Sequence, residues 1–149
     1  MVERLPMSAH ATLLAIDDEP DVLVVIGQFA RRFGFTVVTR TDARAAIKEL
    51  RDLKPDAVIV DLKMPDLNGL DVLRAIRDID QTCQIILMTG QPSVDTAIEA
   101  VKLGALDYIS KPFDLTRLGG LLTGLHRRKR DTGQTELERG HDQPPTPDR

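Results

Sequence analysis

The stretch from Val58 to Leu73, VIVDLKMPDLNGLDVL, changes its pattern twice. A run of apolar residues ends in the carboxylate of Asp61, a turn containing proline, asparagine and glycine follows, and an amphipathic pattern then begins. This order predicts a buried strand, a loop and a helix, with Asp61 at the C-terminal end of the strand. Ligands bind at that edge of open α/β sheets. A lone acid there could also cap a helix or lie in a solvated loop, so its chemistry depends on what the other strands bring to the same edge.

Length and composition favour one ordinary globular domain. The chain has 149 residues, of which 42% are hydrophobic and 29% charged, and these values are typical of a soluble single-domain protein. A net charge of −3 and a pI of about 5.6 do not favour nucleic-acid binding over the whole surface. The single cysteine, Cys83, excludes an intrachain disulfide, and no apolar run is long enough to span a bilayer. We therefore expect a cytoplasmic protein that contacts neither a membrane nor nucleic acid directly.

Strand and helix patterns alternate along the chain. We expect strands at residues 12–16, 35–39, 57–60, 84–88 and 106–109. Helices are expected at residues 20–33, from 41 or 42 to 53, from 68 or 69 to 79, at 93–103, and from a cap at Asp114 to about residue 126. Five strand–helix alternations predict an α/β fold with a parallel sheet, right-handed crossovers and helices on both faces.

Each expected helix carries apolar residues at helical spacing, which predicts the face that it buries. In three of the helices the residues expected to face inward are Val22, Val25, Ile26, Phe29 and Phe33, then Val94, Ala97, Ile98 and Val101, and finally Leu115, Leu118, Leu122 and Leu125. The last helix also contains Gly119, Gly120 and Gly124. Because a glycine inside a helix costs about 1 kcal/mol relative to alanine, we expect the last helix to be the least stable element.

The two ends of the chain lack apolar periodicity. We interpret residues 1–11 as a flexible N-terminal tail and residues 12–126 as the domain. Residues 127–149 are charged and proline-rich, so we interpret them as a disordered tail or a linker. This ending fits a natural terminus and an interdomain linker equally well.

Four of the five expected strands end in a side chain that could bind a ligand or take part in a reaction. Asp17 and Asp18 follow the first strand, Asp61 the third, Thr89 the fourth and Lys111 the fifth. In a parallel sheet these ends share one edge, so three carboxylates, a hydroxyl and an ammonium group should converge. Clustered carboxylates repel unless a cation joins them, and a few oxygen ligands with room for water are typical of a magnesium site. Such a metal and a lysine can neutralise a phosphoryl group, with Asp61 as the natural nucleophile.

Four segments of the sequence resemble the receiver domain of bacterial two-component response regulators, the CheY-like family. They are IDDEPDVL at residues 16–23, VDLKMPDLNG at 60–69, MTG at 88–90 and GALDYISKPFD at 104–114. The resemblance covers about residues 12–126. It implies a flavodoxin-like (βα)5 fold, a doubly wound parallel sheet with strand order 2-1-3-4-5.

The same resemblance implies roles for the residues at the sheet edge. Asp61 matches the aspartate that accepts a phosphoryl group from a phosphohistidine, carried by a sensor histidine kinase or a histidine phosphotransfer protein. The side chains of Asp18 and Asp61 match ligands of Mg²⁺, Asp17 matches a position that binds the metal through water, and Lys63 matches one that offers its backbone carbonyl. Lys111 matches the lysine that pairs with the phosphoryl oxygens.

The resemblance also implies a conformational switch. Thr89 and Tyr108 match a pair in which the threonine hydroxyl moves to the phosphoryl group and the tyrosine ring fills the vacated space. Pro112 matches a proline that follows a cis peptide bond after the lysine. The surface expected to change consists of the fourth helix, the fifth strand and the fifth helix, the face that in this family docks a downstream partner or a second copy of the domain.

Several readings of the function remain open at this stage. The leading one is a single-domain response regulator that catalyses only its own phosphorylation and dephosphorylation and is not otherwise an enzyme. Another is the N-terminal receiver piece of a larger regulator. A Mg²⁺-dependent aspartyl phosphatase of the haloacid-dehalogenase type needs a second acid two residues after the nucleophile, where this chain has Lys63. An FMN-binding flavodoxin needs a hydroxyl- and glycine-rich phosphate loop, where this chain has Asp17, Asp18 and Glu19.

Overall fold

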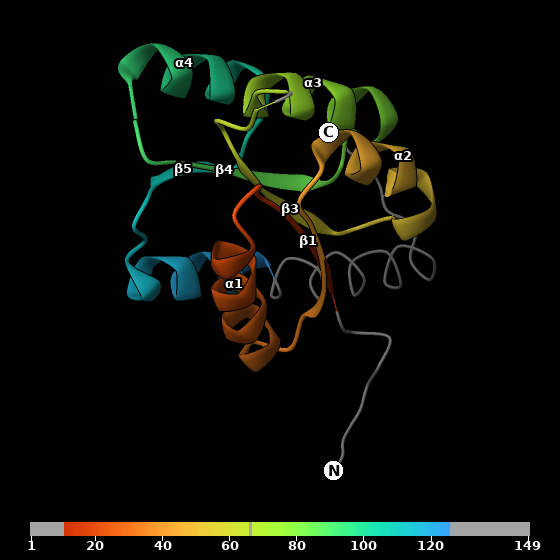
Figure 1. Ribbon diagram of the computed structural model, residues 1–149, viewed down its shortest axis with the longest axis vertical. Helices are drawn as coiled ribbons and strands as arrows, with labels where there is room; N and C mark the ends of the chain where they lie inside the picture. The colour runs from red at the N-terminus through yellow and green to blue at the C-terminus, as the bar shows by residue number, and fades with distance from the viewer. Residues whose placement is uncertain (1–10, 66, 126–149) are drawn as a thin grey trace, which may run out of the picture.

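A computed structural model describes residues 11–65 and 67–125 of the chain. Five parallel strands form one sheet with the order β2-β1-β3-β4-β5 (Figure 1). The labelled elements are β1 (Thr12–Ile16), α1 (Pro20–Arg32), β2 (Thr36–Arg40), α2 (Ala43–Leu53), β3 (Ala57–Asp61), α3 (Gly69–Ile79), β4 (Gln84–Thr89), α4 (Val94–Lys102) and β5 (Asp107–Ser110). Residues 115–125 form a further helix. The predicted fold class and strand order are confirmed.

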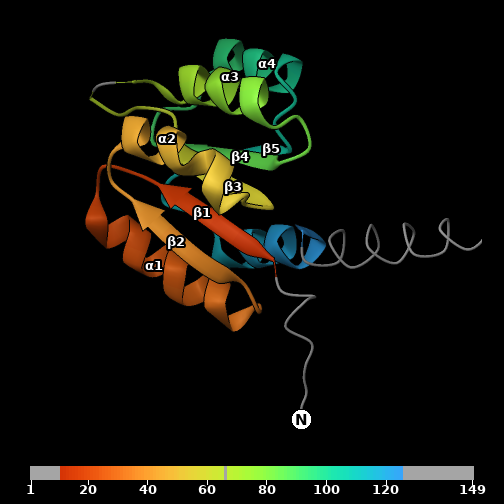
Figure 2. The same ribbon diagram turned by 90° about the vertical axis from the view of Figure 1, so that its right-hand side faces the viewer.

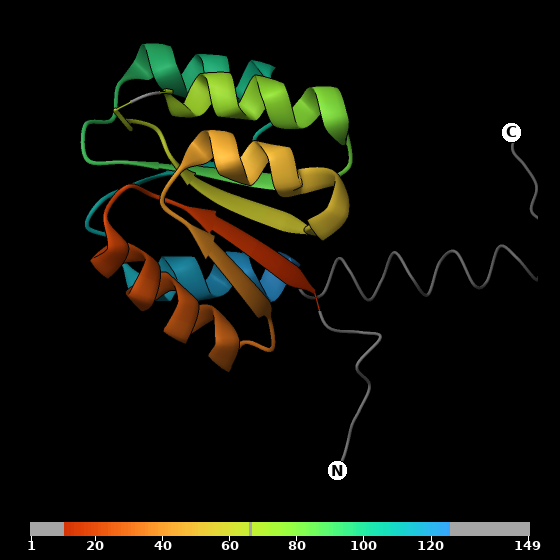
Figure 3. The same ribbon diagram turned by 45° about the vertical axis from the view of Figure 1, so that its right-hand side comes forward.

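Helices cover both faces of the sheet. Figure 2 and Figure 3 show α2, α3 and α4 on one face, and α1 with the helix of residues 115–125 on the other. The central strands are mostly apolar because both of their faces are covered: every residue of β3 is buried, and all but its last residue, Asp61, are apolar. Successive side chains of a strand point to opposite faces, so Leu13 and Ala15 join the cluster on the α1 side, whereas Leu14 and Ile16 join the cluster on the α2–α4 side.

Local capping explains where several helices begin and end. The carboxylate of Asp42 accepts hydrogen bonds from the first-turn amides of α2, and the side chain of Asn68 does the same for Asp71 in α3. Gly34 has a φ of +92° and follows the end of α1, as the sequence predicts. The strands lie within about one residue of the predicted ranges.

The prediction for the buried face of α1 is partly wrong. Val25 is 47% exposed, whereas Leu23 and Ile26 are buried. Phe29 and Phe33 are partly buried against the cluster on the α1 side, as expected. The run Val22-Leu23-Val24-Val25-Ile26 is apolar on every side of the helix, so spacing alone does not select the face that packs on the sheet.

The prediction for the buried face of α4 is wrong for three of its four residues. Val94, Ile98 and Val101 are 74%, 50% and 71% exposed, and Ala100 is the only fully buried residue of this helix. The inward face of α4 thus uses small side chains, which allow the helix to lie close to its neighbours. Its larger apolar residues form an exposed stripe, named here the α4 stripe (Val94, Ile98 and Val101).

The last helix follows its predicted pattern except at one end. Leu118, Leu122 and Leu125 are buried, but Leu115 is 46% exposed. A Cβ atom at Gly119 would lie 3.0 Å from Cζ of Phe33, so this glycine allows the helix to approach α1 closely. Gly120 and Gly124 have no such neighbour within 4 Å. The relative stability of the helix stays a prediction.

The predicted N-terminal tail ends one residue earlier than expected. Ala11 is 1% exposed, and its carbonyl oxygen accepts a hydrogen bond of 2.9 Å from the N–H of Thr36. Ala11 therefore belongs to the fold, because this residue extends the pairing of β1 with β2. The rest of the predicted tail, the last residue of the predicted domain and residues 127–149 lie outside the described residues. No helix within residues 11–65 and 67–125 has the length and apolar character needed to cross a membrane.

Candidate functional site

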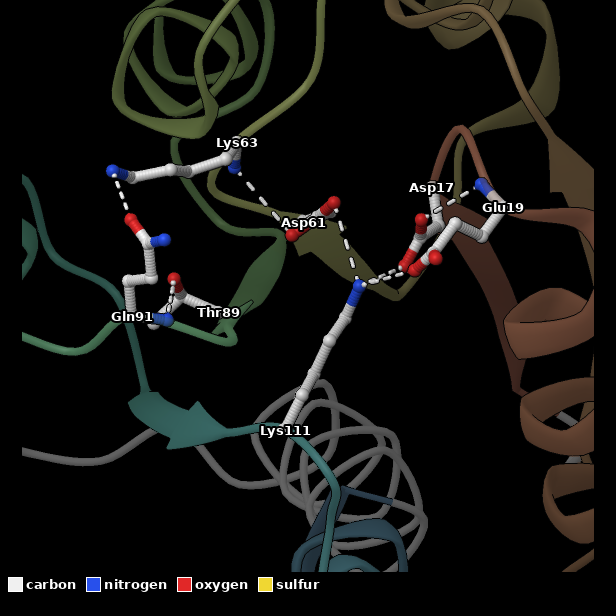
Figure 4. A network of polar contacts seen from close by, with 7 residues as sticks. All are labelled: Asp17, Glu19, Asp61, Lys63, Thr89, Gln91 and Lys111. Atoms are coloured by element: carbon white, nitrogen blue, oxygen red, sulfur yellow. Dashed lines mark hydrogen bonds and ion pairs between the residues drawn. The ribbon is translucent and has the colours of Figure 1, made fainter.

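The C-terminal ends of the strands gather the polar side chains that the sequence predicts (Figure 4). Asp17, Asp61 and Thr89 are buried, with exposed fractions of 0%, 5% and 0%. The register places Asp61 of β3 beside Met88 of β4. Parallel pairing of neighbouring strands thus carries groups that are distant in the sequence to one edge.

Asp61 is held by the loop that follows it. The N–H of Leu62 donates to the carbonyl oxygen of Met88 at 2.7 Å, and the N–H of Gly69 donates to the carbonyl oxygen of Leu62 at 2.6 Å. A Cβ atom at Gly69 would lie 2.7 Å from Cα of Leu62 and 2.9 Å from the carbonyl oxygen of Asp61. Only glycine fits here without displacing the backbone beside Asp61.

The acid pair after β1 consists of one buried and one exposed carboxylate. Oδ1 of Asp17 accepts a hydrogen bond of 2.9 Å from the N–H of Glu19, which fixes the Asp17 side chain at the start of α1. Asp18 is exposed. Asp17, Asp18 and Asp61 each offer one carboxylate oxygen, and these three oxygens lie within 4.8 Å of one another.

Lys111 is the cation of this cluster. Its Nζ lies 2.7 Å from Oδ2 of Asp17, 3.4 Å from Oδ2 of Asp61 and 3.4 Å from Oε1 of Glu19, and its side chain is 16% exposed. The N–H of Lys111 donates to the carbonyl oxygen of Thr89 at 2.7 Å, which ties the residue to the end of β4. The peptide bond from Lys111 to Pro112 is cis.

Burial and mutual repulsion shift the titration of these groups. Desolvation raises the pKa of Asp17 above its ordinary value of 3.8, against the hydrogen bond from Lys111. Desolvation, followed by the negative charge of Asp17, also raises the pKa of Asp61 above 3.8. Desolvation lowers the pKa of Lys111, but the hydrogen bond and charge of Asp17 and the charge of Asp61 outweigh it, so the net pKa is raised above 10.5. The ionised carboxylates are therefore held together at an electrostatic cost.

The acidic cluster fits a hard divalent cation. All three candidate ligands are carboxylates, which hard cations prefer, and exposed Asp18 leaves one side of the cluster open to water. Burial raises the pKa values of Asp17 and Asp61, and the charge of Asp17 raises that of Asp61 further, so a cation would relieve that cost. The residues present can hold a metal ion beside Asp61.

Lys63 and Thr89 meet through Gln91 on the other side of Asp61. The side chain of Lys63 is directed away from the carboxylates, and its Nζ donates to Oε1 of Gln91 at 2.9 Å. The N–H of Lys63 donates to Oδ1 of Asp61 at 3.4 Å. Oγ1 of Thr89 accepts a hydrogen bond of 3.0 Å from the N–H of Gln91. The hydroxyl of Thr89 thus keeps its own proton available to donate.

Tyr108 is half-buried and contacts α4 instead of the acidic cluster. It lies on β5 two residues before Ser110, which is the register partner of Thr89. Its hydroxyl accepts a hydrogen bond of 3.2 Å from the N–H of Ser93 and shares a short one with Oγ1 of Thr96. The structure therefore gathers Asp17, Asp18, Asp61, Lys111 and Thr89 at one edge and connects Tyr108 to the start of α4.

Sequence reasoning missed several residues that shape this edge. Gly69 was expected only as a turn and helix start, although its missing Cβ is what lets the loop close on Asp61. The contacts of Gln91 with Lys63 and of Thr96 with Tyr108 were not predicted, because the partners are distant in the sequence. Glu19, which reaches Lys111 from the start of α1, is the second residue after Asp17, and its place in an acidic run was the only available signal.

The arrangement of these groups is suited to the transfer of a phosphoryl group to a carboxylate. Asp61 is a buried acceptor with one cationic side chain near it, and it lies beside carboxylates that can bind a metal. Preorganised positive groups of this kind stabilise the charge that develops on a transferring phosphoryl group. Acyl phosphates are known products of carboxylate nucleophiles.

A family model described as the response regulator receiver domain matches residues 13–123. The transcriptional regulatory protein PrrA of Mycobacterium bovis is 33% identical over 126 residues, which are 85% of this chain and 54% of PrrA. The regulatory protein AtoC of Escherichia coli is 36% identical over 112 residues, which are 75% of this chain and 24% of AtoC. The chain thus spans about half or less of the length of these curated relatives.

Solved structures give the same result. A response regulator receiver domain protein from Clostridium thermocellum superposes with a TM-score of 0.74 and 34% identity, over 80% of this chain and 97% of that one. The receiver domain of NtrC4, solved as a beryllofluoride-activated dimer, superposes with a TM-score of 0.74 and 27% identity, over 79% of this chain and 98% of that one. With its sheet order, its acidic edge and these matches, the chain belongs to the response regulator receiver domain family.

Proposed function

We propose that this chain is a phosphorylation-controlled switch in which Asp61 accepts a phosphoryl group from a phosphohistidine. The donor is a sensor histidine kinase or a histidine phosphotransfer protein. The observation that carries the proposal is the position of Asp61, which is 5% exposed, lies 3.4 Å from Nζ of Lys111 and shares a carboxylate cluster with Asp17 and Asp18. Family membership supports the same role.

The transfer is a displacement at phosphorus. A carboxylate oxygen of Asp61 forms the new P–O bond while the P–N bond of the phosphohistidine breaks, and the imidazole nitrogen keeps the electron pair. Asp61 is ready as a nucleophile because a carboxylate needs no general base to attack. Its raised pKa reflects burial and the charge of Asp17, which also make the ionised carboxylate costly to leave unpaired.

Positive charge for the phosphoryl oxygens comes from two sources. Asp18, Asp61 and the backbone carbonyl of Lys63 would hold Mg²⁺, with Asp17 contributing through water, and the bound metal would supply positive charge for the phosphoryl oxygens. Lys111 supplies the second positive charge. Because its Nζ already lies between Asp17 and Asp61, a short movement toward the new phosphoryl oxygens keeps it paired throughout the reaction.

Thr89 and Tyr108 transmit the effect of phosphorylation at Asp61 to the surface of the domain. The hydroxyl proton of Thr89 is free to donate, since Oγ1 is the acceptor for the N–H of Gln91, and a phosphoryl group on Asp61 offers new acceptor oxygens. When Thr89 moves toward them, Tyr108 moves into the space beside β4. The surface affected contains α4, β5 and the helix of residues 115–125. Its exposed α4 stripe is the apolar patch offered to a downstream protein or a second copy of the domain.

This role makes the chain a cytoplasmic signalling switch that catalyses only its own phosphorylation and dephosphorylation. The proposal holds equally for a single-domain regulator and for the receiver part of a longer one, since the relatives are longer than the matched region. The phosphatase reading is not favoured, because Lys63 occupies the position of the second acid and its Nζ binds Gln91. Direct contact with nucleic acid is not part of the proposed role.

The test is the intact mass of the protein after incubation with Mg²⁺ and acetyl phosphate, for the wild type and for Asp61→Asn. We expect one added phosphoryl group in the wild type, none in the variant, and none in the wild type when the metal is chelated. The exposed Asp78 on α3 provides a matched control, because Asp78→Asn removes a carboxylate away from the cluster and should leave the gain intact. A gain that survives in Asp61→Asn, or that needs no divalent cation, would contradict the proposal.

A further inference from the structure

Apolar burial contributes little to holding α4 in place. Of its residues only Ala100 is fully buried, and the α4 stripe faces solvent. Among the described residues, one ion pair connects α4 to α3: it joins Arg74 to Glu99 at 3.4 Å, with both side chains more than a third exposed. Exposed pairs of this kind are worth little. The position of α4 must therefore depend on the contacts at its two ends.

The C-terminal end of α4 is held by Arg77 of α3. The guanidinium donates to the carbonyl oxygens of Leu103 at 3.3 Å and Gly104 at 2.8 Å, just beyond the helix, and to that of Cys83 at 2.6 Å before β4. The last carbonyl groups of a helix lack intrahelical partners, and a cation there also complements the helix dipole. Arg77 thus ties the end of α4 to the start of β4 through several hydrogen bonds.

The N-terminal end of α4 is held by Tyr108 of β5. Its hydroxyl accepts the N–H of Ser93, the residue that caps α4, and is hydrogen-bonded to Oγ1 of Thr96. The Thr96 hydroxyl also lies 2.9 Å from Oγ and 3.2 Å from the carbonyl oxygen of Ser93. Thr96 therefore links the first turn of α4 to the ring whose movement the proposed function requires.

The two ends differ in what switching would do to them. The guanidinium of Arg77 donates hydrogen bonds to the backbone carbonyl groups of Cys83, Leu103 and Gly104 and, more distantly, Asp80, and none of these belongs to the acidic edge. Tyr108, in contrast, must leave Ser93 and Thr96 when it moves along β4. One end of α4 is thus tied to the switch, whereas the other is tied to the scaffold.

We propose that Thr96 and Arg77 are positioning residues of the switch. Thr96 holds the first turn of α4 to Tyr108 until the tyrosine moves, and Arg77 keeps the opposite end of the helix fixed. Release at the first turn alone makes α4 pivot about its C-terminal end, so that Val94 is displaced more than Val101 and the α4 stripe changes direction. This inference rests on the proposed function of Asp61.

The first test measures amide hydrogen exchange in the full chain without any additive. Thr96→Val keeps the shape of the side chain and removes its hydroxyl, and Tyr108→Phe removes the other partner. Each should speed exchange at Ser93 and Ala97 about two- to tenfold, the range expected for one hydrogen bond. Because both variants break the same contact between Thr96 and Tyr108, the double variant should speed exchange by less than the product of the two single effects, and Thr96→Ser should restore wild-type rates.

Independent, multiplying effects of Thr96→Val and Tyr108→Phe would overturn the proposal, as would unchanged exchange in Thr96→Val. Arg77→Met, which keeps an apolar stem, should instead speed exchange about tenfold at Leu103 and Gly104 and leave Ser93 unchanged. Equal acceleration at both ends of α4 would mean that Arg77 stabilises the whole domain and does not position one end, which also overturns the proposal. Far-ultraviolet circular dichroism checks that each variant is folded.

The second test adds beryllofluoride and Mg²⁺, a stand-in for the phosphoryl group. In the wild type we expect faster exchange at Ser93 and Ala97 with no change at Leu103. In Thr96→Val the additive should produce little further change at the first turn, and Thr96→Ser should respond as the wild type does. A response at Gln91 with none in α4, or an equal response at both ends of α4, would overturn this inference alone. No response at Gln91 or α4 would overturn the proposed function together with it.

Discussion

Folding places Asp61 where an ionised carboxylate is disfavoured. It is 5% exposed, and both desolvation and the charge of Asp17 raise its pKa. Lys111 offsets part of this cost from 3.4 Å. A buried acid that stays near a second acid is typical of a functional site, because packing alone would favour a neutral side chain there. A cation bound beside Asp61 would lower this electrostatic cost.

Asp61→Asn should therefore stabilise the protein at neutral pH. Asparagine has nearly the same shape and removes the buried charge, so the free energy of unfolding should rise by on the order of 1 kcal/mol. Because the folded-state pKa of Asp61 lies above its ordinary value of 3.8, the penalty exists only where the group is ionised in the folded state. The advantage of the variant should thus be complete at pH 7 and fade as the pH falls through that pKa.

Urea unfolding of both proteins at several pH values between 4 and 7, in the presence of a chelator, measures this difference. Asp78→Asn, at an exposed position of α3, should change stability by much less. Equal stabilisation by the two variants, or an advantage for Asp61→Asn that grows as the pH falls, would contradict the electrostatic explanation.

At the scale of elements, the helix of residues 115–125 shows that glycines in one helix have different roles. A Cβ at Gly119 would lie 3.0 Å from Cζ of Phe33 and 3.5 Å from Cζ of Phe29, whose rings are 5.1 Å apart. Nothing lies within 4 Å of a Cβ at Gly120. Alanine substitutions at these two positions can thus distinguish the effect of helix propensity on stability from the effect of close packing.

Gly120→Ala should raise the free energy of unfolding by up to about 1 kcal/mol, because it adds helix propensity without a clash. Gly119→Ala gains the same propensity but must displace the Phe33 ring, so it should gain less or destabilise the protein. Thermal unfolding of the two variants measures the difference. Equal stabilisation by both substitutions would show that the last helix does not depend on its approach to α1.

The elements themselves were predictable because their patterns are local. Apolar runs such as Leu13 to Ile16 and caps such as Asp42 and Asn68 depend on neighbouring residues only, and the structure places strands and helix starts where these signals lie. The faces of α1 and α4 were less predictable. In α4 the larger residues Val94 and Ile98 point outward, since the inner side is filled by small alanines, and helical spacing cannot tell an apolar stripe kept for a partner from one that packs on the sheet.

At the scale of the whole molecule, the site exists only because the sheet brings its strand ends together. The strand ends carrying Asp17, Asp61, Thr89 and Lys111 could be placed at one edge from the sequence, because parallel strands share an edge. Contacts across it could not be predicted: the 2.7 Å pair between Lys111 and Asp17 spans most of the domain in sequence. Such contacts depend on register and rotamers that no local pattern encodes.

Mg²⁺ should stabilise the folded protein by binding this edge. Binding to the folded state alone raises stability by mass action, so Tm should rise by about 3–5 °C when Mg²⁺ is tenfold above its Kd. Differential scanning calorimetry with Mg²⁺ and with a chelator measures the rise. Asp18→Asn removes an exposed ligand and should reduce the rise, whereas Asp78→Asn should retain it. An equal rise in wild type and Asp18→Asn would place the metal elsewhere.

The central claim is that Asp61, among three adjacent carboxylates, is the one that accepts the phosphoryl group. Borohydride reduces an acyl phosphate to an alcohol, so treating the protein after incubation with Mg²⁺ and acetyl phosphate marks the modified residue for peptide mass spectrometry. The account predicts the reduced side chain at position 61 only, and none when the metal is chelated. Reduction at Asp17 or Asp18, or at none of the three under conditions that add a phosphoryl group to the protein, would contradict it.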